Sequence, residues 1–323
     1  MASTSASALA SPAALEKALA RTYVADARTA LSAWLAIELG RPLLLEGPAG
    51  VGKTDLARAL AETLERPLVR LQCYEGLDEA KALYEWDYAK QMLYTQLLRD
   101  SVAKLVGAPA GLSAGSAGPQ GGAESVVDAV DRLAGAESAF FGKRFLIARP
   151  LLQVLESDRP AVLLVDEVDR ADPEFEAFLL EILSENQVTI PELGTVKAAH
   201  PPLVILTTNA TRDMTDALRR RCLHAFLDYP PPSRELVILE LRVPGIAKDL
   251  GAALVRFVHE VRGLELRKAP SIAETIDWAR ALILLGASAL DKELVSSTLG
   301  ELVKHEEDRR KVEASLPKLL PGK

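Results

Sequence analysis

Residues 47–54 are Gly47-Pro48-Ala49-Gly50-Val51-Gly52-Lys53-Thr54, and they directly follow the apolar run Leu43-Leu44-Leu45. A buried strand that continues through a glycine-rich loop into a helix forms a phosphate cradle, because glycines let backbone N–H groups approach a polyphosphate and the helix N-terminus adds a positive dipole. Lys53 would reach the outer phosphates and the Thr54 hydroxyl would hold Mg²⁺. An incidental glycine turn is the alternative, but it leaves the match at eight positions unexplained. We therefore predict that a nucleoside triphosphate is bound by Gly47, Pro48, Ala49, Gly50, Val51, Gly52, Lys53, Thr54 and Asp55.

The composition narrows the class of protein. The chain has 323 residues, enough for two domains, and its formal net charge of −7 gives no overall attraction for nucleic acid or an anionic membrane. Its two cysteines suit a reducing compartment. The first residues lack the basic and apolar regions of a secretory signal, and no apolar run reaches the roughly 18 residues that a membrane span needs. We expect a soluble cytoplasmic protein without a membrane span, for which nucleic acid is an unfavoured partner.

Apolar runs predict the fold class, an α/β fold. Strands are expected at residues 42–45, 67–71, 161–165 and 203–208, and they alternate with helical segments such as 173–185, which favours a parallel sheet flanked by helices. A rigid break follows at Pro230-Pro231-Pro232, after which no strand pattern recurs. The predicted organisation is a flexible tail (1–25), an α/β nucleotide-binding domain (26–232) and a small all-α lid domain (233–323) that ends in a solvated charged helix at 299–314.

An insertion is expected within the first domain at residues 76–146. Residues 107–123 are a low-complexity run dominated by glycine, alanine, serine and proline, for which a disordered loop is expected because such a segment cannot bury enough apolar surface. Residues 74–105 and 147–157 are expected to be helical. The aromatic residues Tyr84, Trp86 and Tyr88 either belong to a core or subunit interface, or grip a substrate.

Two carboxylates, Asp166 and Glu167, directly follow the apolar strand 161–165. Ligands of open α/β sheets bind beyond the carboxyl ends of the strands, so both side chains are candidates for the nucleotide site. We predict that Asp166 holds Mg²⁺ and that Glu167 orients and deprotonates the attacking water. An acidic loop after a strand is the alternative, and the glycine-rich loop upstream disfavours it.

Two further groups have open interpretations. Asn209 ends the next strand, where its amide could bridge the water and the γ-phosphate, although asparagine is also an ordinary turn residue. The cluster Arg219-Arg220-Arg221 could be a solvated face, or could complement the dipole of a helix C-terminus. It could also supply an arginine to the active site of a neighbouring subunit, since a planar guanidinium suits phosphoryl oxygens.

Taken in order, these motifs and the helical lid resemble an AAA+ ATPase, a P-loop NTPase. Within that class, residues 166–173 (Asp-Glu-Val-Asp-Arg-Ala-Asp-Pro) and 179–190 (Leu-Leu-Glu-Ile-Leu-Ser-Glu-Asn-Gln-Val-Thr-Ile) resemble the MoxR family. In that family, an Asp-Glu-(Ile/Val)-x-Arg-Ala segment precedes a Leu-Leu-Glu helix and a Gln-Val-Thr-Ile hairpin. Residues 71–86 look like the CoxD-type branch, named for carbon monoxide dehydrogenase maturation. The resemblance covers about residues 30–285.

This resemblance implies roles for individual residues. Lys53 and Thr54 match the Walker A positions, Asp166 and Glu167 match Walker B, and Asn209 matches the first sensor. Arg221 best matches the arginine finger, with Arg220 second. The family often has an arginine after a Ser-Pro pair in the lid as a second sensor, and here Ser271 stands near that position. Either Arg267 or Lys268 substitutes for it, or the lid senses nucleotide weakly.

The resemblance also implies a function. A ring, expected to be a hexamer, would hydrolyse ATP with Mg²⁺ to remodel a client protein together with a von Willebrand factor A (VWA)-domain adaptor. Insertion or maturation of a metal cofactor, such as a molybdenum–copper centre, is one such task. Two alternatives remain: a nucleic-acid motor or loader, which the acidic balance disfavours, and a slow nucleotide-dependent binding switch, which Glu167 disfavours.

Overall fold

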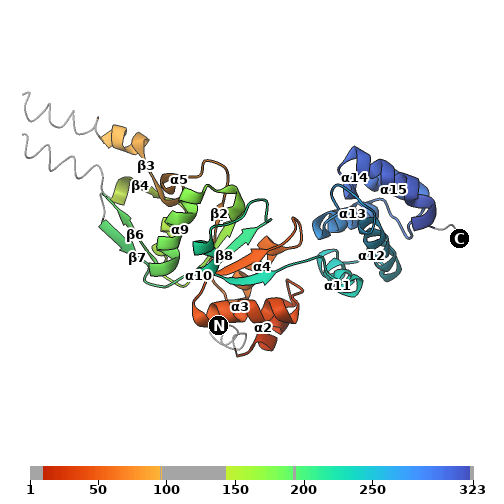
Figure 1. Ribbon diagram of the computed structural model, residues 1–323, viewed down its shortest axis with the longest axis horizontal. Coiled ribbons are helices and arrows are strands. Elements are labelled where there is room, and N and C mark those ends of the chain that lie inside the picture. The colour runs from red at the N-terminus through yellow and green to blue at the C-terminus, as the bar shows by residue number, and fades with distance from the viewer. Residues whose placement is uncertain (1–9, 95, 97–142, 192–193, 321–323) are drawn as a thin grey trace, which may run out of the picture.

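A computed structural model of the protein describes residues 10–94, 96, 143–191 and 194–320. Its central element is a five-stranded parallel sheet with the strand order β2-β5-β8-β1-β9 (Figure 1). The strands are β1 Leu43–Glu46, β2 Leu68–Gln72, β5 Val162–Asp166, β8 Leu203–Thr208 and β9 Leu223–Phe226. The predicted α/β fold with a parallel sheet is therefore confirmed.

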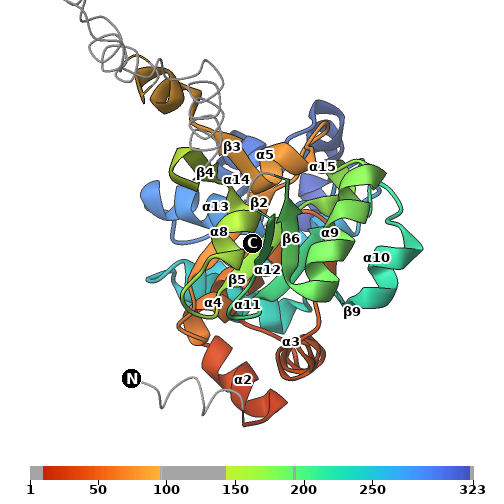
Figure 2. The same cartoon turned by 90° about the vertical axis from the view of Figure 1, so that its left-hand side faces the viewer.

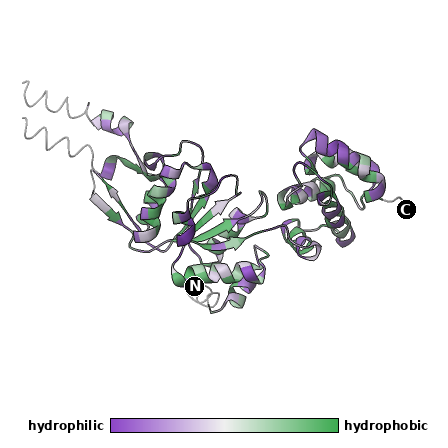
Figure 3. Cartoon of the chain, in the orientation of Figure 1, coloured by the Kyte–Doolittle hydropathy of each residue, from purple (hydrophilic) through white to green (hydrophobic). Residues whose placement is uncertain are grey.

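Helices cover both faces of the sheet. One face, which we name the α4 face, carries α2 Pro12–Leu19, α3 Ala27–Leu39 and α4 Lys53–Thr63, and the opposite face carries α5 Glu79–Leu83, α8 Pro150–Leu155, α9 Pro173–Glu185 and α10 Asp216–Arg221 (Figures 1 and 2). Successive side chains of a strand point to opposite faces, so Val162 and Leu164 of β5 enter the core of the α4 face, while Leu163 and Val165 enter the other core. The central strands are accordingly apolar on both faces (Figure 3).

Part of the range 1–25, for which a tail was predicted, is helical. Residues 12–19 form α2, which begins after Ser11, whose hydroxyl accepts a hydrogen bond from the backbone N–H of Ala14. Leu15 and Leu19 lie one turn apart and are fully buried in the core of the α4 face. Burial of these two leucines explains why a short helix forms within the range 1–25.

Within residues 74–105, the expected helical structure holds for only part of the described residues 74–94 and 96. Tyr84–Trp86 form β3, which pairs antiparallel with β4 Leu146–Ala148, so the predicted helix 147–157 is also replaced by β4 and the shorter α8. The partner strands are far apart in the sequence, and local periodicity cannot detect such a pairing. Tyr84 packs against the core and Tyr88 is exposed. The predicted loop 107–123 lies outside the described residues.

A two-stranded hairpin and the edge strand of the main sheet complete the described part of the first domain. β6 Gln187–Ile190 and β7 Gly194–Lys197 form a hairpin, at the place of the Gln-Val-Thr-Ile hairpin that the resemblance implies. The edge strand β9 was not predicted, because only four residues alternate and they directly follow the arginine cluster. β9 exists because it pairs with β1 along its whole length.

The C-terminal domain is all helical, as predicted, and has its own core around Phe257 and Trp278. It consists of α11 Pro232–Arg242, α12 Lys248–Arg262, α13 Ile272–Leu284, α14 Lys292–Leu302 and α15 Glu306–Leu319. The predicted solvated helix 299–314 is wrong in two respects: a break separates α14 from α15, and Asp308 is buried. No helix among the described residues is long and apolar enough to cross a bilayer.

A buried ion pair joins three helices of this domain. The guanidinium of Arg262 on α12 donates to both carboxylate oxygens of Glu235 on α11, at 2.6 and 2.7 Å, and its Nε donates to the Pro270 carbonyl before α13. Arg262 also lies 4.6 Å from the ring centroid of Tyr229, in the connection between the two domains. Glu235 is almost fully buried. The pair therefore fixes how α11, α12 and the interdomain connection meet.

We expect the substitution Arg262→Met to lower the free energy of unfolding of the helical domain by about 3–5 kcal/mol, because the buried Glu235 carboxylate loses both guanidinium hydrogen bonds and keeps, among the described residues, only the His259 ring and the Thr275 hydroxyl as side-chain partners. Guanidinium unfolding followed by fluorescence measures this in a Trp34→Phe/Trp86→Phe background, in which the remaining tryptophan is Trp278 of the domain core. The control is Arg310→Met, which removes an exposed arginine of α15. The double variant Arg262→Met/Glu235→Leu should regain most of the loss. A loss below about 1 kcal/mol in the single variant would contradict the assignment.

Candidate nucleotide-binding site

A cleft of about 490 Å³ lies where the carboxyl ends of the strands meet the helical domain. The α/β domain contributes the loop 49–54, the acidic pair after β5 and the end of β8, while α11 and α13 line the opposite wall. Of the predicted site residues, the cleft is lined by Ala49, Gly50, Val51, Gly52, Lys53, Thr54, Asp55, Asp166, Glu167 and Asn209. The fold thus brings together motifs that are more than 150 residues apart in the sequence.

The loop before α4 requires glycine at several positions. Gly50 and Gly52 have φ of 75° and 97°, in the left-handed region that side chains disfavour. Gly47 lies so close to the chain that a Cβ there would stand 1.9 Å from the carbonyl oxygen of Leu227. These conformations leave the N-terminus of α4 open for a phosphate chain. Pro48 and Gly47 do not line the cleft directly, and their carbonyls instead position Lys53.

Lys53 is the buried cation of the site. Its ammonium donates to the carbonyls of Gly47 and Pro48 at 2.7 and 2.8 Å, and to Oδ1 of Asn209 at 2.8 Å. Burial lowers the pKa of Lys53, and the carboxylates of Asp169, Asp166 and Glu167 act in the opposite direction. Because the Lys53 ammonium is already removed from water, it can exchange these uncharged oxygen acceptors for phosphate oxygens at little further cost in desolvation.

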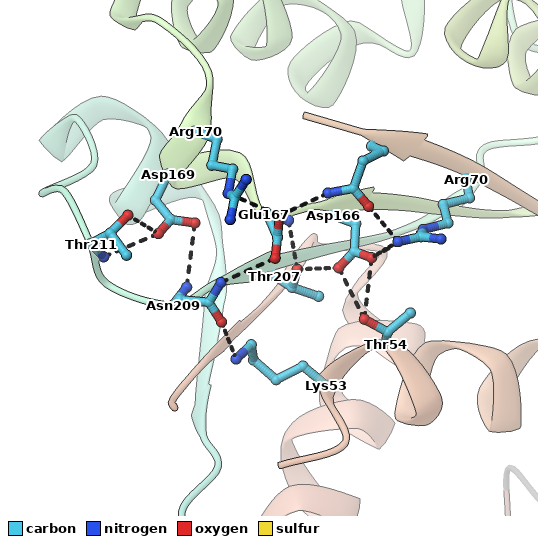
Figure 4. A network of polar contacts seen from close by, with 11 residues as sticks. Lys53, Thr54, Arg70, Asp166, Glu167, Asp169, Arg170, Thr207, Asn209 and Thr211 are labelled. Carbon is cyan, nitrogen blue, oxygen red and sulfur yellow. Dashed lines mark hydrogen bonds and ion pairs between the residues drawn. The ribbon is translucent and has the colours of Figure 1, made fainter. Parts of the chain in front are cut away.

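Asp166 and Thr54 together fit a magnesium site. The Thr54 hydroxyl lies 3.1 and 3.2 Å from the two carboxylate oxygens of Asp166, and Asp166 also accepts from the Thr207 hydroxyl at 2.5 Å (Figure 4). Hydroxyl and carboxylate oxygens are the hard ligands that Mg²⁺ takes alongside water and phosphate. Arg70 of β2 contacts the same carboxylate at 2.6 Å.

Glu167 lies beside Asp166 but points into a different set of contacts. Its backbone has φ 56° and ψ 50°, which ends the strand abruptly, and its N–H donates to the Thr207 hydroxyl at 2.8 Å. One carboxylate oxygen accepts from Gln72 at 3.0 Å and lies 3.0 Å from Nε of Arg170. The other accepts from the Asn209 amide at 3.4 Å. The side chain is thus held at the cleft rather than on a solvated loop (Figure 4).

Asn209 lies between Lys53 and Glu167 and contacts both (Figure 4). Its loop is held by Asp169, whose carboxylate accepts from the backbone N–H of Asn209 and from the N–H and hydroxyl of Thr211. Burial alone would raise the pKa of Asp169, but these hydrogen bonds lower it below the ordinary value.

The two predicted finger arginines lie outside the cleft. Arg220 and Arg221 end α10, are exposed, and have no side-chain partner among the described residues. Their backbone carbonyls accept hydrogen bonds from the guanidinium of Arg41, which satisfies the end of the helix. Arg219 differs, because its guanidinium lies 3.2 Å from the carboxylate of Glu46.

The predicted second-sensor residues are not brought to the site. Arg267 and Lys268 are exposed and do not line the cleft, and their backbone N–H groups donate to Asp308. Ser271 does face the phosphate-binding loop, since a Cβ on Gly50 would stand 2.4 Å from its hydroxyl. The helical-domain arginines that line the cleft are Arg242 and Arg280.

Several residues in the cleft or in contact with its carboxylates were not predicted from the sequence. Tyr23 lies 3.3 Å from the Cβ position of Gly52, and Arg242 pairs with Asp55 at 2.7 Å across the two domains. Arg70 and Gln72 contact the two carboxylates from β2. The last two carried a usable signal, because they are polar residues at alternate positions near the end of a predicted parallel strand. Tyr23 and Arg242 carried none, since only the tertiary fold brings them to the cleft.

The chain resembles known proteins in its sequence. Residues 42–222, more than half of the chain, match the family described as AAA domain, dynein-related subfamily. Chaperone protein ClpB of Corynebacterium diphtheriae is 30% identical over 223 residues, covering 65% of this chain and 21% of ClpB. An uncharacterized protein of Staphylococcus saprophyticus is 23% identical over 286 residues, covering 87% of this chain and 90% of that protein.

Among solved structures, a single-residue mutant of RuvB from Thermotoga maritima aligns with a TM-score of 0.47 and 15% identity, covering 97% of this chain and 79% of that chain.

The chain spans only 13% to 21% of the length of the first two ClpB relatives. The family match begins at β1, includes both acidic residues and Asn209, and ends after the arginines of α10. The chain therefore belongs to the AAA domain family of ATPases, dynein-related subfamily.

Proposed function

We propose that this chain is a MoxR-type AAA+ ATPase that hydrolyses ATP with Mg²⁺ in a ring of identical subunits, expected to be a hexamer, and uses the energy to remodel a client protein. One observation carries the proposal: the loop 47–54, Asp166, Glu167 and Asn209 converge on one cleft closed by the helical domain, whereas the exposed Arg220 and Arg221 lie outside it. Arg242 and Arg280 line this cleft from the helical domain, and we propose that one further arginine comes from a neighbouring subunit.

Within the cleft, residues of this chain divide the work. Lys53 and the backbone N–H groups of the loop would hold the β- and γ-phosphates, and Thr54 and Asp166 would hold Mg²⁺, which neutralises phosphate charge when it is bound. Glu167 would orient the attacking water and accept its proton, with Asn209 fixing the position of that carboxylate. The apolar side chains of Val24, Ile238 and Ile276 line the cleft and provide a wall suited to the adenine base of ATP.

Exposure of Arg220 and Arg221 supports assembly. A guanidinium at the end of a helix, with no partner in the described part of its own chain, is available to the phosphates of a neighbouring subunit, where it would stabilise charge in the transition state. Arg41 holds the backbone of both residues, so the side chains project from a fixed base. Each subunit would thus complete the site of the next.

The client is inferred from the motifs and the relatives. Residues 166–173 and 179–190 have the MoxR pattern, with α9 and the β6–β7 hairpin as its structural counterparts. The ClpB relatives are named chaperone proteins, in keeping with a protein substrate. We propose that a VWA-domain adaptor presents the client, and that maturation of a metal cofactor in a molybdenum enzyme is one such task.

The substitution Lys53→Ala tests nucleotide binding. We expect ATP affinity to fall roughly 10- to 100-fold, because a charge-assisted hydrogen bond contributes about 1.5–3 kcal/mol. Titration of a fluorescent ATP analogue measures this, and Lys81→Ala, which removes an exposed lysine, is the control. Wild-type affinity in Lys53→Ala would contradict the placement of the phosphates.

Recovery of no VWA-domain protein by an ATP-trapped ring would contradict the proposed adaptor.

A further inference from the structure

Arg70 contacts the carboxylate that the proposed function assigns to Mg²⁺. Its Nε and Nη2 lie 3.0 and 2.6 Å from Oδ2 of Asp166 (Figure 4). β2 and β5 pair in parallel, with Gln72 opposite Asp166. Leu68 packs against the core of the α4 face. Arg70 is two residues further along β2 and therefore points to the same face, which also carries Thr54. Strand register therefore builds this contact, unlike the chance approach of two surface side chains.

The two partners of this ion pair differ in their freedom to move. The Asp166 side chain is 4% exposed and is also held by the hydroxyls of Thr54 and Thr207. The Arg70 side chain is 45% exposed and has a long flexible stem. A carboxylate buried this deeply needs a compensating charge. Arg70 supplies that charge and can leave toward solvent without disturbing the core.

Under the proposed function, magnesium and Arg70 would share one acceptor group, the carboxylate of Asp166. Mg²⁺ binds hard oxygen ligands with a strict geometry, directly or through its water. A guanidinium 2.6 Å from Oδ2 occupies the space around that oxygen, and two cations this close would repel each other strongly in a partly buried site. Simultaneous occupation of Asp166 by both is therefore unfavourable.

We propose that Arg70 is an internal counter-cation that Mg²⁺ displaces from Asp166 when the metal arrives with ATP. This inference rests on the proposed function. Displacement also affects Glu167, because Arg70 donates to Oε1 of Gln72, whose amide donates to Glu167 at 3.0 Å. Release of Arg70 frees Gln72 to change this contact. Arg70 is thus a positioning residue that links metal binding to the carboxylate that orients the water.

The substitution Arg70→Met removes the competing cation. We expect the Mg²⁺ concentration at half-maximal binding of a non-hydrolysable fluorescent ATP analogue to fall roughly tenfold, because Mg²⁺ no longer has to break a charge-assisted contact. Arg170→Met is the matched control, since it removes a positive charge that lies 3.0 Å from Glu167 instead of Asp166. An equal shift in both variants would show a general field effect and overturn the proposal, as would an unchanged or raised midpoint in Arg70→Met.

Stability provides a second measurement. Without Mg²⁺, Arg70→Met should melt roughly 2–4 °C below wild type, because Asp166 loses its counter-charge, and Mg²⁺ with the analogue should remove the difference. A deficit that persists with Mg²⁺ would indicate a purely structural arginine and contradict displacement.

A measurement on the wild-type chain avoids any folding defect of the variant. The Nε–H signal of Arg70, assigned by its absence in Arg70→Lys, should shift when Mg²⁺ is added to the analogue complex and stay unchanged when the analogue is added alone. A signal that does not respond to Mg²⁺ would overturn the proposal. Failure of the wild-type chain to bind the analogue at any Mg²⁺ concentration would instead contradict the proposed function.

Discussion

Glu167→Gln is expected to bind Mg²⁺·ATP with wild-type affinity and to hydrolyse it roughly 100- to 10,000-fold more slowly, the contribution typical of a general base. Glutamine has the size of glutamate but only one acceptor oxygen, so it can keep the hydrogen bond from Gln72 or the one from Asn209, but not both as they stand. It cannot accept a proton from water. Phosphate release under single-turnover conditions, together with analogue titration, separates the two effects.

A matched control is Glu174→Gln, an exposed glutamate in the first turn of α9. It should change neither binding nor turnover. Because bound ATP would persist in Glu167→Gln, the variant should also stabilise the ring, which sedimentation velocity can detect. Loss of nucleotide binding in Glu167→Gln would assign this residue to the nucleotide or its metal, and turnover at the wild-type rate would exclude it as the base.

Arg221→Ala is expected to keep ATP affinity and to lose about 10³- to 10⁵-fold in turnover, the range for removal of an arginine finger. The side chain is exposed and the backbone carbonyl, which Arg41 contacts, is retained, so the fold should be unaffected. Arg220→Ala, measured in parallel, shows which of the two arginines supplies the cation, since both are exposed on α10.

Mixing experiments test whether the arginine acts on a neighbour. Arg221→Ala subunits keep an intact cleft, and Lys53→Ala subunits keep an intact Arg221, so mixed rings should regain part of the activity. The double variant Lys53→Ala/Arg221→Ala lacks Arg221 and should not rescue Arg221→Ala if Arg221 is the donated arginine. Absence of rescue at every ratio of the single variants would contradict a finger supplied between subunits.

Much of the fold was predictable from local pattern. The buried strands at 161–165 and 203–208 are continuous apolar runs, and α9 has both a proline start and helical spacing, so each was placed within one residue. β3, β4 and β9 were missed because they are short and owe their existence to pairing partners distant in sequence. The charged neighbours of Asp308 predict that it lies on the surface. In the fold it is buried, and its carboxylate accepts hydrogen bonds from the backbone N–H groups of Arg267 and Lys268.

The residues of the candidate site also divide into those that local sequence pattern predicts and those that only tertiary packing places. Lys53, Thr54, Asp166, Glu167 and Asn209 were predicted from short motifs at strand ends, and they line one cleft because parallel strands bring such ends to one edge. Arg267 and Lys268 were predicted from their position near a family motif, but the wall of the cleft is formed by Arg242 and Arg280, because the packing of α11 and α13 decides which side chains face it.

The sequence by itself determined a phosphate-binding loop, an acidic pair and an α/β core, because glycine conformations, strand periodicity and charge are local properties. Only the tertiary structure decided that Arg70 pairs with Asp166 and that Asp169 holds the loop of Asn209. These contacts depend on strand register and on segments separated by tens of residues. No local pattern encodes them, since they arise only when the chain closes on itself.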